Sequence, residues 1–182
     1  SETPSRTLTY TAPINWAERH QALDQVQSWT ISGKIGIKQP DSSDSAIINR
    51  WQQMDSQFII ELSSTILGIG STQISGSPST LHIINNDGET MTSNNPEIAL
   101  YQQLGWSLPI KHLPYWIKGT PYPNDTSSVT FNKEGDPTGI SQSGWQINLS
   151  RYQPVEEHRL PGKIKLYKGD VRIILIINGW QL

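Results

Sequence analysis

The feature that most constrains the fold is a two-residue alternation of apolar and polar side chains that begins at Ser28. Polar or charged residues there alternate with an apolar set, Trp29, Ile31, Ile35 and Ile37, as in a strand with one buried face. Comparable short stretches follow at 46–54, 57–62, 70–75, 81–85, 129–132, 139–143, 145–150, 163–167 and 171–177. Because turn residues separate these stretches, the sequence predicts about ten or eleven antiparallel strands in a meander.

The size of this sheet predicts its shape. Residues 171–177 are apolar at nearly every position, so we expect a central strand covered on both sides. A sheet of about ten twisted strands tends to curl, and a barrel of eight strands already has room for a small ligand. We therefore expect a mainly β fold with a hydrophobic cavity.

Three helical segments interrupt the strand pattern. The first runs from Trp16 to about Gln27, the second lies between Asn95 and Gly105, and the third runs from Ile110 to Ile117. Asn95 followed by Pro96 is a typical helix start, and Gly105 a typical stop. Helices placed against the opening of a curled sheet would act as a plug or lid.

The chain is expected to form one domain. Residues 1–13 are rich in Ser, Thr and Pro and have no periodicity, which favours a flexible tether. Residues 14–182 then form a single β domain.

Composition argues against several functions. The net charge is −2 and only 16% of residues are charged, so we expect no nucleic acid partner. The chain has no Cys, which excludes a thiolate metal site and a Cys nucleophile. The four His are far apart in sequence, and no nucleophile elbow, phosphate loop or dinucleotide motif occurs. We expect no metal, no cofactor and no enzymatic activity.

Two features bear on a membrane. No apolar stretch reaches the roughly 20 residues of a membrane-spanning helix, and no signal peptide is present, so the chain is expected to be cytoplasmic or a processed form. The connection after residue 62, however, contains Ile66, Leu67 and Gly68, whereas hairpin tips are normally polar. These two aliphatic residues either fold back into a core or project as an apolar tip that contacts lipid.

Four segments together resemble one protein family. They are Trp29-x3-Gly33-Lys34-Ile35, Arg50-Trp51-Gln52-Gln53 with the 66–68 tip, Leu104-Gly105-Trp106-x-Leu108-Pro109 leading into Tyr115-Trp116-Ile117-x-Gly119, and Arg172-Ile173 to Trp180. Their order and spacing resemble the bacterial outer-membrane lipoprotein receptor family, LolB. The resemblance covers the chain from Trp16 to Trp180.

The resemblance implies an open antiparallel β-barrel of about eleven strands with a helical lid. It implies a receptor on the periplasmic side of the outer membrane that accepts acylated lipoproteins from a LolA-type periplasmic carrier and places them in the membrane lipid. Members carry an acylated N-terminal Cys, which is absent from this chain, and the family's membrane-contact loop corresponds to Ile66, Leu67 and Gly68. We expect a monomer in which the acyl chains contact a set of cavity and lid residues: Trp29, Ile35, Trp51, Phe58, Ile60, Leu100, Leu104, Leu113, Trp116, Trp145, Ile147 and Leu175.

Two other binding functions remain open from the residues alone. One is a soluble periplasmic lipoprotein carrier resembling LolA, which would lack the apolar tip and the acyl anchor. The other is a small-ligand binder of the lipocalin type.

Overall fold

The computed structural model describes residues 9–63 and 71–182. The helices are α1 (Trp16–Gln25), α2 (Pro96–Leu104) and α3 (Leu113–Trp116). The strands are β1 (Ser28–Gln39), β2 (Ser42–Met54), β3 (Gln57–Ser63), β4 (Thr72–Ser77), β5 (Thr80–Asn85), β6 (Thr90–Ser93), β7 (Ser127–Phe131), β8 (Pro137–Gln142), β9 (Trp145–Ser150), β10 (Gln153–Val155), β11 (His158–Leu160), β12 (Lys163–Lys168) and β13 (Val171–Gln181).

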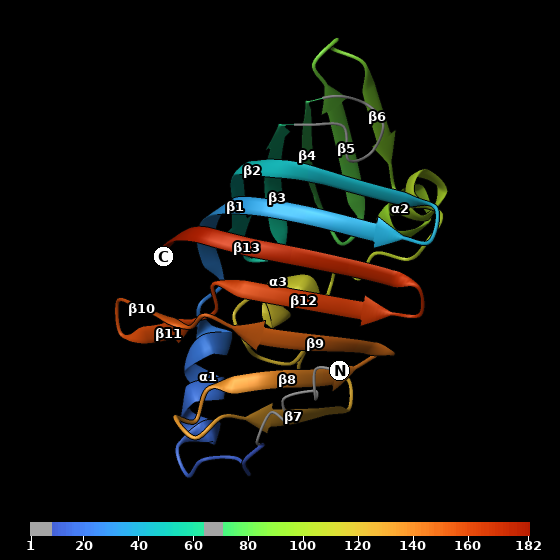
Figure 1. Ribbon diagram of the computed structural model, residues 1–182. Helices are drawn as coiled ribbons and strands as arrows, with labels where there is room; N and C mark the ends of the chain where they lie inside the picture. Colours follow the sequence, from blue (N-terminus) through green and yellow to red (C-terminus); the bar gives the residue numbers. More distant parts are fainter. Residues whose placement is uncertain (1–8, 64–70) are drawn as a thin grey trace.

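Within the described residues, eleven strands form one antiparallel sheet in the order β6-β5-β4-β3-β2-β1-β13-β12-β9-β8-β7. Two meanders, β1 to β6 and β7 to β13, meet where β1 pairs with β13. In Figure 1 the strands β4 to β6 stand nearly upright while β13 and β12 lie nearly level, so the sheet is strongly twisted. Because β6 and β7 are edges that do not pair with each other, the sheet is open. The expected open antiparallel sheet of about eleven strands is confirmed.

The connectivity explains why a helical segment covers the sheet. The chain leaves the sheet at β6, one edge, and re-enters at β7, the opposite edge. The connection, residues 94–126, must therefore cross one face of the sheet, and it carries α2 and α3. Trp106, Trp116 and Ile117 from this connection join the same hydrophobic core as the strands. We call residues 94–126 the cover segment.

Local sequence determines where α2 begins and ends. The side chain of Asn95 accepts a hydrogen bond from the backbone N–H of Ile98, and Pro96 occupies the first turn. Gly105 ends the helix in the left-handed conformation, with φ +79°, which glycine adopts without strain. These boundaries are as predicted. Ile98 and Tyr101 of this helix are exposed.

Other local predictions were wrong in extent. The third helix is shorter than the predicted 110–117 segment, because only Leu113–Trp116 is α-helical. The strand β6 and the small hairpin β10–β11 were not predicted. The strand β13 is central, as predicted, but only one of its faces is fully covered, since Ile173 and Leu175 are buried and Ile174 is partly exposed.

The segment predicted as a tether is described only from residue 9 onward. There the backbone N–H of Tyr10 donates to the carbonyl of Phe131 at 3.0 Å. Residues 1–8 lie outside the described residues, so the tether and the domain limits stay predictions.

Candidate functional site

An apolar cavity lies between the sheet and the cover segment. Its floor comes from alternate residues of β1 to β5, and its roof from α2, α3 and the residues between them. The volume of this cavity is about 100 Å³, below the roughly 300–1,000 Å³ of pockets that hold drug-sized ligands. In this conformation the cavity is thus largely filled by its own walls.

The cavity gathers residues that are far apart in sequence because alternate positions of neighbouring strands share one face. Seven of the predicted residues line it: Ile35, Trp51, Phe58, Ile60, Leu100, Leu104 and Leu113. The remaining wall was not predicted, and it comprises Ile37, Ile48, Gln53, Leu62, Ile74, Leu81, Leu108, Ile110 and Pro114. The strand periodicity carried a signal for several of these, since Ile37, Gln53 and Leu62 each follow a predicted residue by two positions.

Five predicted cavity residues lie elsewhere. Trp29 lines a second pocket, described below, while Trp116, Trp145, Ile147 and Leu175 are buried in the common core.

Indole rings fill the space over the C-terminal half of the sheet. The ring of Trp145 lies 6.3 Å from that of Trp106 and 6.4 Å from that of Trp116. Trp116 is fully buried, and its indole N–H donates to the side-chain oxygen of Gln142 at 2.8 Å. The apolar cavity therefore lies over β1 to β5 only.

A second, more polar pocket adjoins the apolar cavity. Its volume is about 340 Å³, and it shares Gln53, Phe58, Ile110 and Pro114 with the apolar cavity. Asp55, Ser56, Lys111, Lys118 and two tyrosines, Tyr115 and Tyr122, also line it. We call it the polar pocket.

Lys118 is the buried cation of the polar pocket. Its side chain donates to the carbonyls of Leu23 and Val26 at 2.8 and 2.9 Å, at the C-terminal end of α1. Burial lowers the pKa of Lys118 to about 8, although the charge of Asp24 acts in the opposite direction. Lys118 thereby connects α1 to the cover segment and places a positive charge beside an apolar cavity.

His112, Asp125 and Ser143 are brought together by the fold, and these are the residue types of a hydrolytic triad. The Nε2 atom of His112 lies 2.7 Å from an oxygen of Asp125 and 3.1 Å from the hydroxyl of Ser143. The Ser143 hydroxyl also donates to Asp125 at 2.9 Å. In a Ser-His-Asp triad, two different ring nitrogens serve the carboxylate and the hydroxyl, so this geometry differs from that of a triad.

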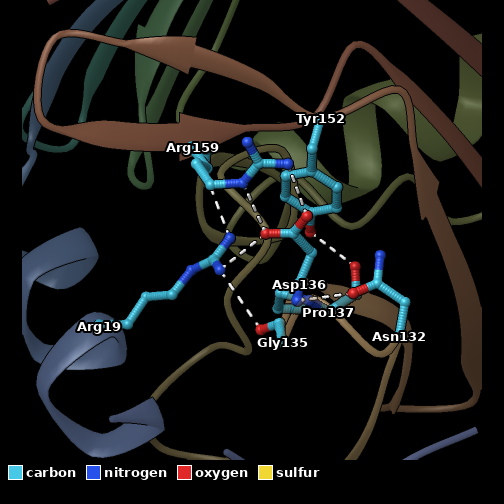
Figure 2. A network of polar contacts seen from close by, with 7 residues as sticks. All are labelled: Arg19, Asn132, Gly135, Asp136, Pro137, Tyr152 and Arg159. Carbon is cyan, nitrogen blue, oxygen red and sulfur yellow. Dashed lines mark hydrogen bonds and ion pairs between the residues drawn. The ribbon is translucent and has the colours of Figure 1, made fainter.

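A second polar cluster fastens α1 to the rest of the molecule (Figure 2). Arg19 of α1 and Arg159 of β11 both donate to the carboxylate of Asp136, each at 2.8 Å. Tyr152 donates to the carbonyl of Pro137 at 2.7 Å, and burial raises the pKa of its phenol. Burial alone would also raise the pKa of Asp136, but the hydrogen bonds from Arg159 and Arg19 bring it below its ordinary value.

The predicted membrane-contact residues Ile66, Leu67 and Gly68 lie outside the described residues. The strands on either side, β3 and β4, pair in antiparallel register. Across the described ranges, no group of three or more His, Asp or Glu is arranged to hold a metal ion. No helix in the same ranges has the length and apolar character needed to span a membrane.

The fold is also found in solved structures of distant sequence. A putative outer membrane lipoprotein-sorting protein domain from Vibrio parahaemolyticus superposes with a TM-score of 0.54 at 8% identity, covering 91% of this chain and 89% of that chain. A LolA superfamily protein from Nitrosomonas europaea has a TM-score of 0.51 at 9% identity, covering 91% and 92%. Both show a similar fold.

Sequence comparison identifies the family of this chain. The outer-membrane lipoprotein LolB of Marinobacter nauticus is 35% identical over 176 residues, which is 96% of this chain and 85% of the relative. That of Pseudomonas savastanoi pv. phaseolicola is 35% identical over 170 residues, or 93% and 82%. The family model "Outer membrane lipoprotein LolB" matches residues 27–180. This chain therefore belongs to the outer-membrane lipoprotein LolB family.

Proposed function

We propose that this LolB-family chain accepts acylated lipoproteins from a LolA-type carrier and places them in the outer membrane, without catalysis and without an energy source. The observation that carries this proposal is the apolar cavity between β1–β5 and the cover segment, in a chain whose relatives are named outer-membrane lipoproteins. We infer that the protein works as a monomer on the periplasmic side of the membrane. An acylated Cys joined to the 1–13 tether would anchor it there.

Energetics explain why such a cargo needs a protein cavity. Each acyl CH₂ costs about 0.8 kcal/mol in water, so two or three long chains cost tens of kcal/mol. Burial against Ile, Leu and Trp side chains replaces burial in lipid. Transfer along a series of such sites needs no energy source if each site binds the chains more favourably than the one before.

The small volume of the apolar cavity has a structural consequence. A space of about 100 Å³ is too small for several acyl chains, so uptake requires the cover segment to move away from β1–β5. Leu100, Leu104 and Leu113 contribute to the roof, and these side chains would exchange contacts with the sheet for contacts with acyl chains. Because this exchange replaces one apolar contact with another, its free-energy cost is low.

The proposed membrane contact is Ile66 and Leu67. Burial of both side chains contributes about 3–6 kcal/mol, which after the cost of association corresponds to millimolar affinity or weaker. A contact of this strength binds lipid transiently. Its proposed role is to touch the bilayer while the cargo leaves the cavity.

Leu67→Glu tests this role in a transfer assay from carrier to protein to liposomes. We expect the variant to fold and take up labelled lipoprotein as the parent does, and to lose transfer into liposomes, because a carboxylate resists entry into lipid. Ile47→Glu, a matched change at an exposed isoleucine of β2, should transfer normally. Equal transfer by Leu67→Glu and the parent would refute the membrane role of this residue.

A further inference from the structure

The boundary between the apolar cavity and the polar pocket includes one unusual residue, Gln53. Among the described residues that line the apolar cavity, only Gln53 has an amide, hydroxyl or charged group in its side chain. It also lines the polar pocket, and it is only 3% exposed. A buried amide at this position is unexpected, because burying a polar group without full hydrogen bonding costs free energy.

The hydrogen bonds of Gln53 leave part of its capacity unused. Its side-chain oxygen accepts from the indole N–H of Trp51 at 3.3 Å, and its side-chain nitrogen donates to the carbonyl of Asp55 at 3.0 Å. A primary amide has two N–H donors and two lone pairs on oxygen. Among the described residues, one N–H of this amide therefore has no acceptor, and it can donate to an acceptor at the boundary of the two spaces.

Lys118 has a similar spare donor in the polar pocket. Among the described residues it donates to two acceptors, the carbonyls of Leu23 and Val26, whereas an ammonium group has three N–H donors. Lys118 is 3% exposed. The polar pocket is thus lined by two buried side chains, each with one N–H that has no hydrogen-bond acceptor among the described residues.

A ligand that fits both spaces must have an apolar chain ending in a hydrogen-bond acceptor. Every acyl chain of a lipoprotein ends in such a group, the carbonyl of an ester or amide. We propose that the polar pocket binds the carbonyl-bearing head of the acylated cargo, with Gln53 and Lys118 donating hydrogen bonds to it, while the chains occupy the apolar cavity. This inference rests on the proposed function and assigns the polar end of the same cargo.

The assignment predicts that the protein distinguishes ester from ether. The probes are two synthetic lipopeptides of equal chain length, one with two palmitoyl esters and the other with two hexadecyl ethers. We expect the parent protein to bind the ester about three- to tenfold more tightly, the value of one hydrogen bond. Fluorescence titration below the aggregation concentration measures both affinities.

Variants identify the donor. Gln53→Met keeps the side-chain size and should reduce the preference for the ester, while Gln52→Met, on the opposite face of β2, should keep that preference in full. Lys118→Met should reduce that preference independently, so the outcome does not depend on one variant folding. The preference is the ratio of the ester and ether affinities of the same variant. A general loss of binding lowers both affinities and cancels in this ratio.

The outcomes separate the inference from the proposed function. Binding of both probes by the parent with equal affinity would overturn the assignment of the polar pocket and leave the lipoprotein-binding proposal intact. An unchanged preference in both Gln53→Met and Lys118→Met would overturn it as well. Failure of the parent to bind either lipopeptide would overturn the proposed function and, with it, this inference.

Discussion

Asp136 shows how one carboxylate positions two distant parts of the chain. It is 1% exposed and bound by Arg19 of α1 and Arg159 of β11. Removing one partner of a buried ion pair leaves an uncompensated charge. Because both arginines bind the same carboxylate, α1 and the β10–β11 hairpin should lose this shared attachment together when Asp136 is changed.

Asp136→Asn is expected to lower the free energy of unfolding by about 2–4 kcal/mol at pH 7. The pKa of Asp136 in the folded protein is below its ordinary value of 3.8, so the ionised form stabilises the fold above pH 4. That contribution is lost as the pH falls through the folded-state pKa. Urea unfolding between pH 7 and pH 2 should therefore show the difference between variant and parent shrinking in acid.

The matched control for this prediction is Glu157→Gln, since the Glu157 side chain is 86% exposed. Its unfolding free energy should stay within about 0.5 kcal/mol of the parent. A difference between Asp136→Asn and the parent that stays constant with pH would contradict the ion-pair account.

The structural role of a residue could be predicted from the sequence where that role depends only on neighbouring residues. Asn95 and Gly105 follow capping rules that need only neighbouring residues. Gln53 was missed because its importance comes from two spaces that meet only after β2, β3 and the cover segment have packed. Strand alternation indicates which residues share a face of the sheet. It does not indicate whether that face lies under a cavity or under packed tryptophan rings.

The junction of the two meanders depends on the close approach of β1 and β13. The register between them shifts at Ser32 and Gly33. A Cβ atom at Gly33 would lie 1.8 Å from the carbonyl oxygen of Ile176, so any side chain there pushes the two strands apart. This explains the glycine within an otherwise regular strand.

Gly33→Ala should lower the free energy of unfolding by about 2–3 kcal/mol, because the backbone of β13 must move to relieve the overlap. Gly36→Ala in the same strand is the control, since its nearest contact is the carbonyl oxygen of Asp44 at 3.9 Å. That variant should stay within about 1 kcal/mol of the parent. Equal stabilities of the two variants in urea unfolding would show that the strands are not closely packed at Gly33.

The elements themselves were predicted to different degrees. Long strands such as β1 and β2 were found from periodicity, and the strand order of each meander follows from antiparallel neighbours. The pairing of β1 with β13 joins the two ends of the domain and has no local signal. The short elements β6, β10, β11 and α3 have too few residues for a periodic pattern, so their presence or extent was missed.

The two halves of the sheet differ in what covers them. The strands β1 to β5 lie under the apolar cavity, whereas the C-terminal half lies under the indole rings of Trp106, Trp116 and Trp145. These rings hold one side of the cover segment firmly against the sheet. We therefore expect the cover segment to separate from β1–β5 when acyl chains enter.

Trp51 provides the most direct test of this central claim, because it lines the apolar cavity. A lipopeptide with bromine atoms on its acyl chains should quench the tryptophan fluorescence of the parent, since bromine quenches only at close contact, and the unbrominated lipopeptide should not. Trp51→Phe should lose most of this quenching, and Trp145→Phe should keep it. Binding of the brominated lipopeptide without quenching, or equal quenching in Trp51→Phe and the parent, would contradict acyl-chain binding in this cavity.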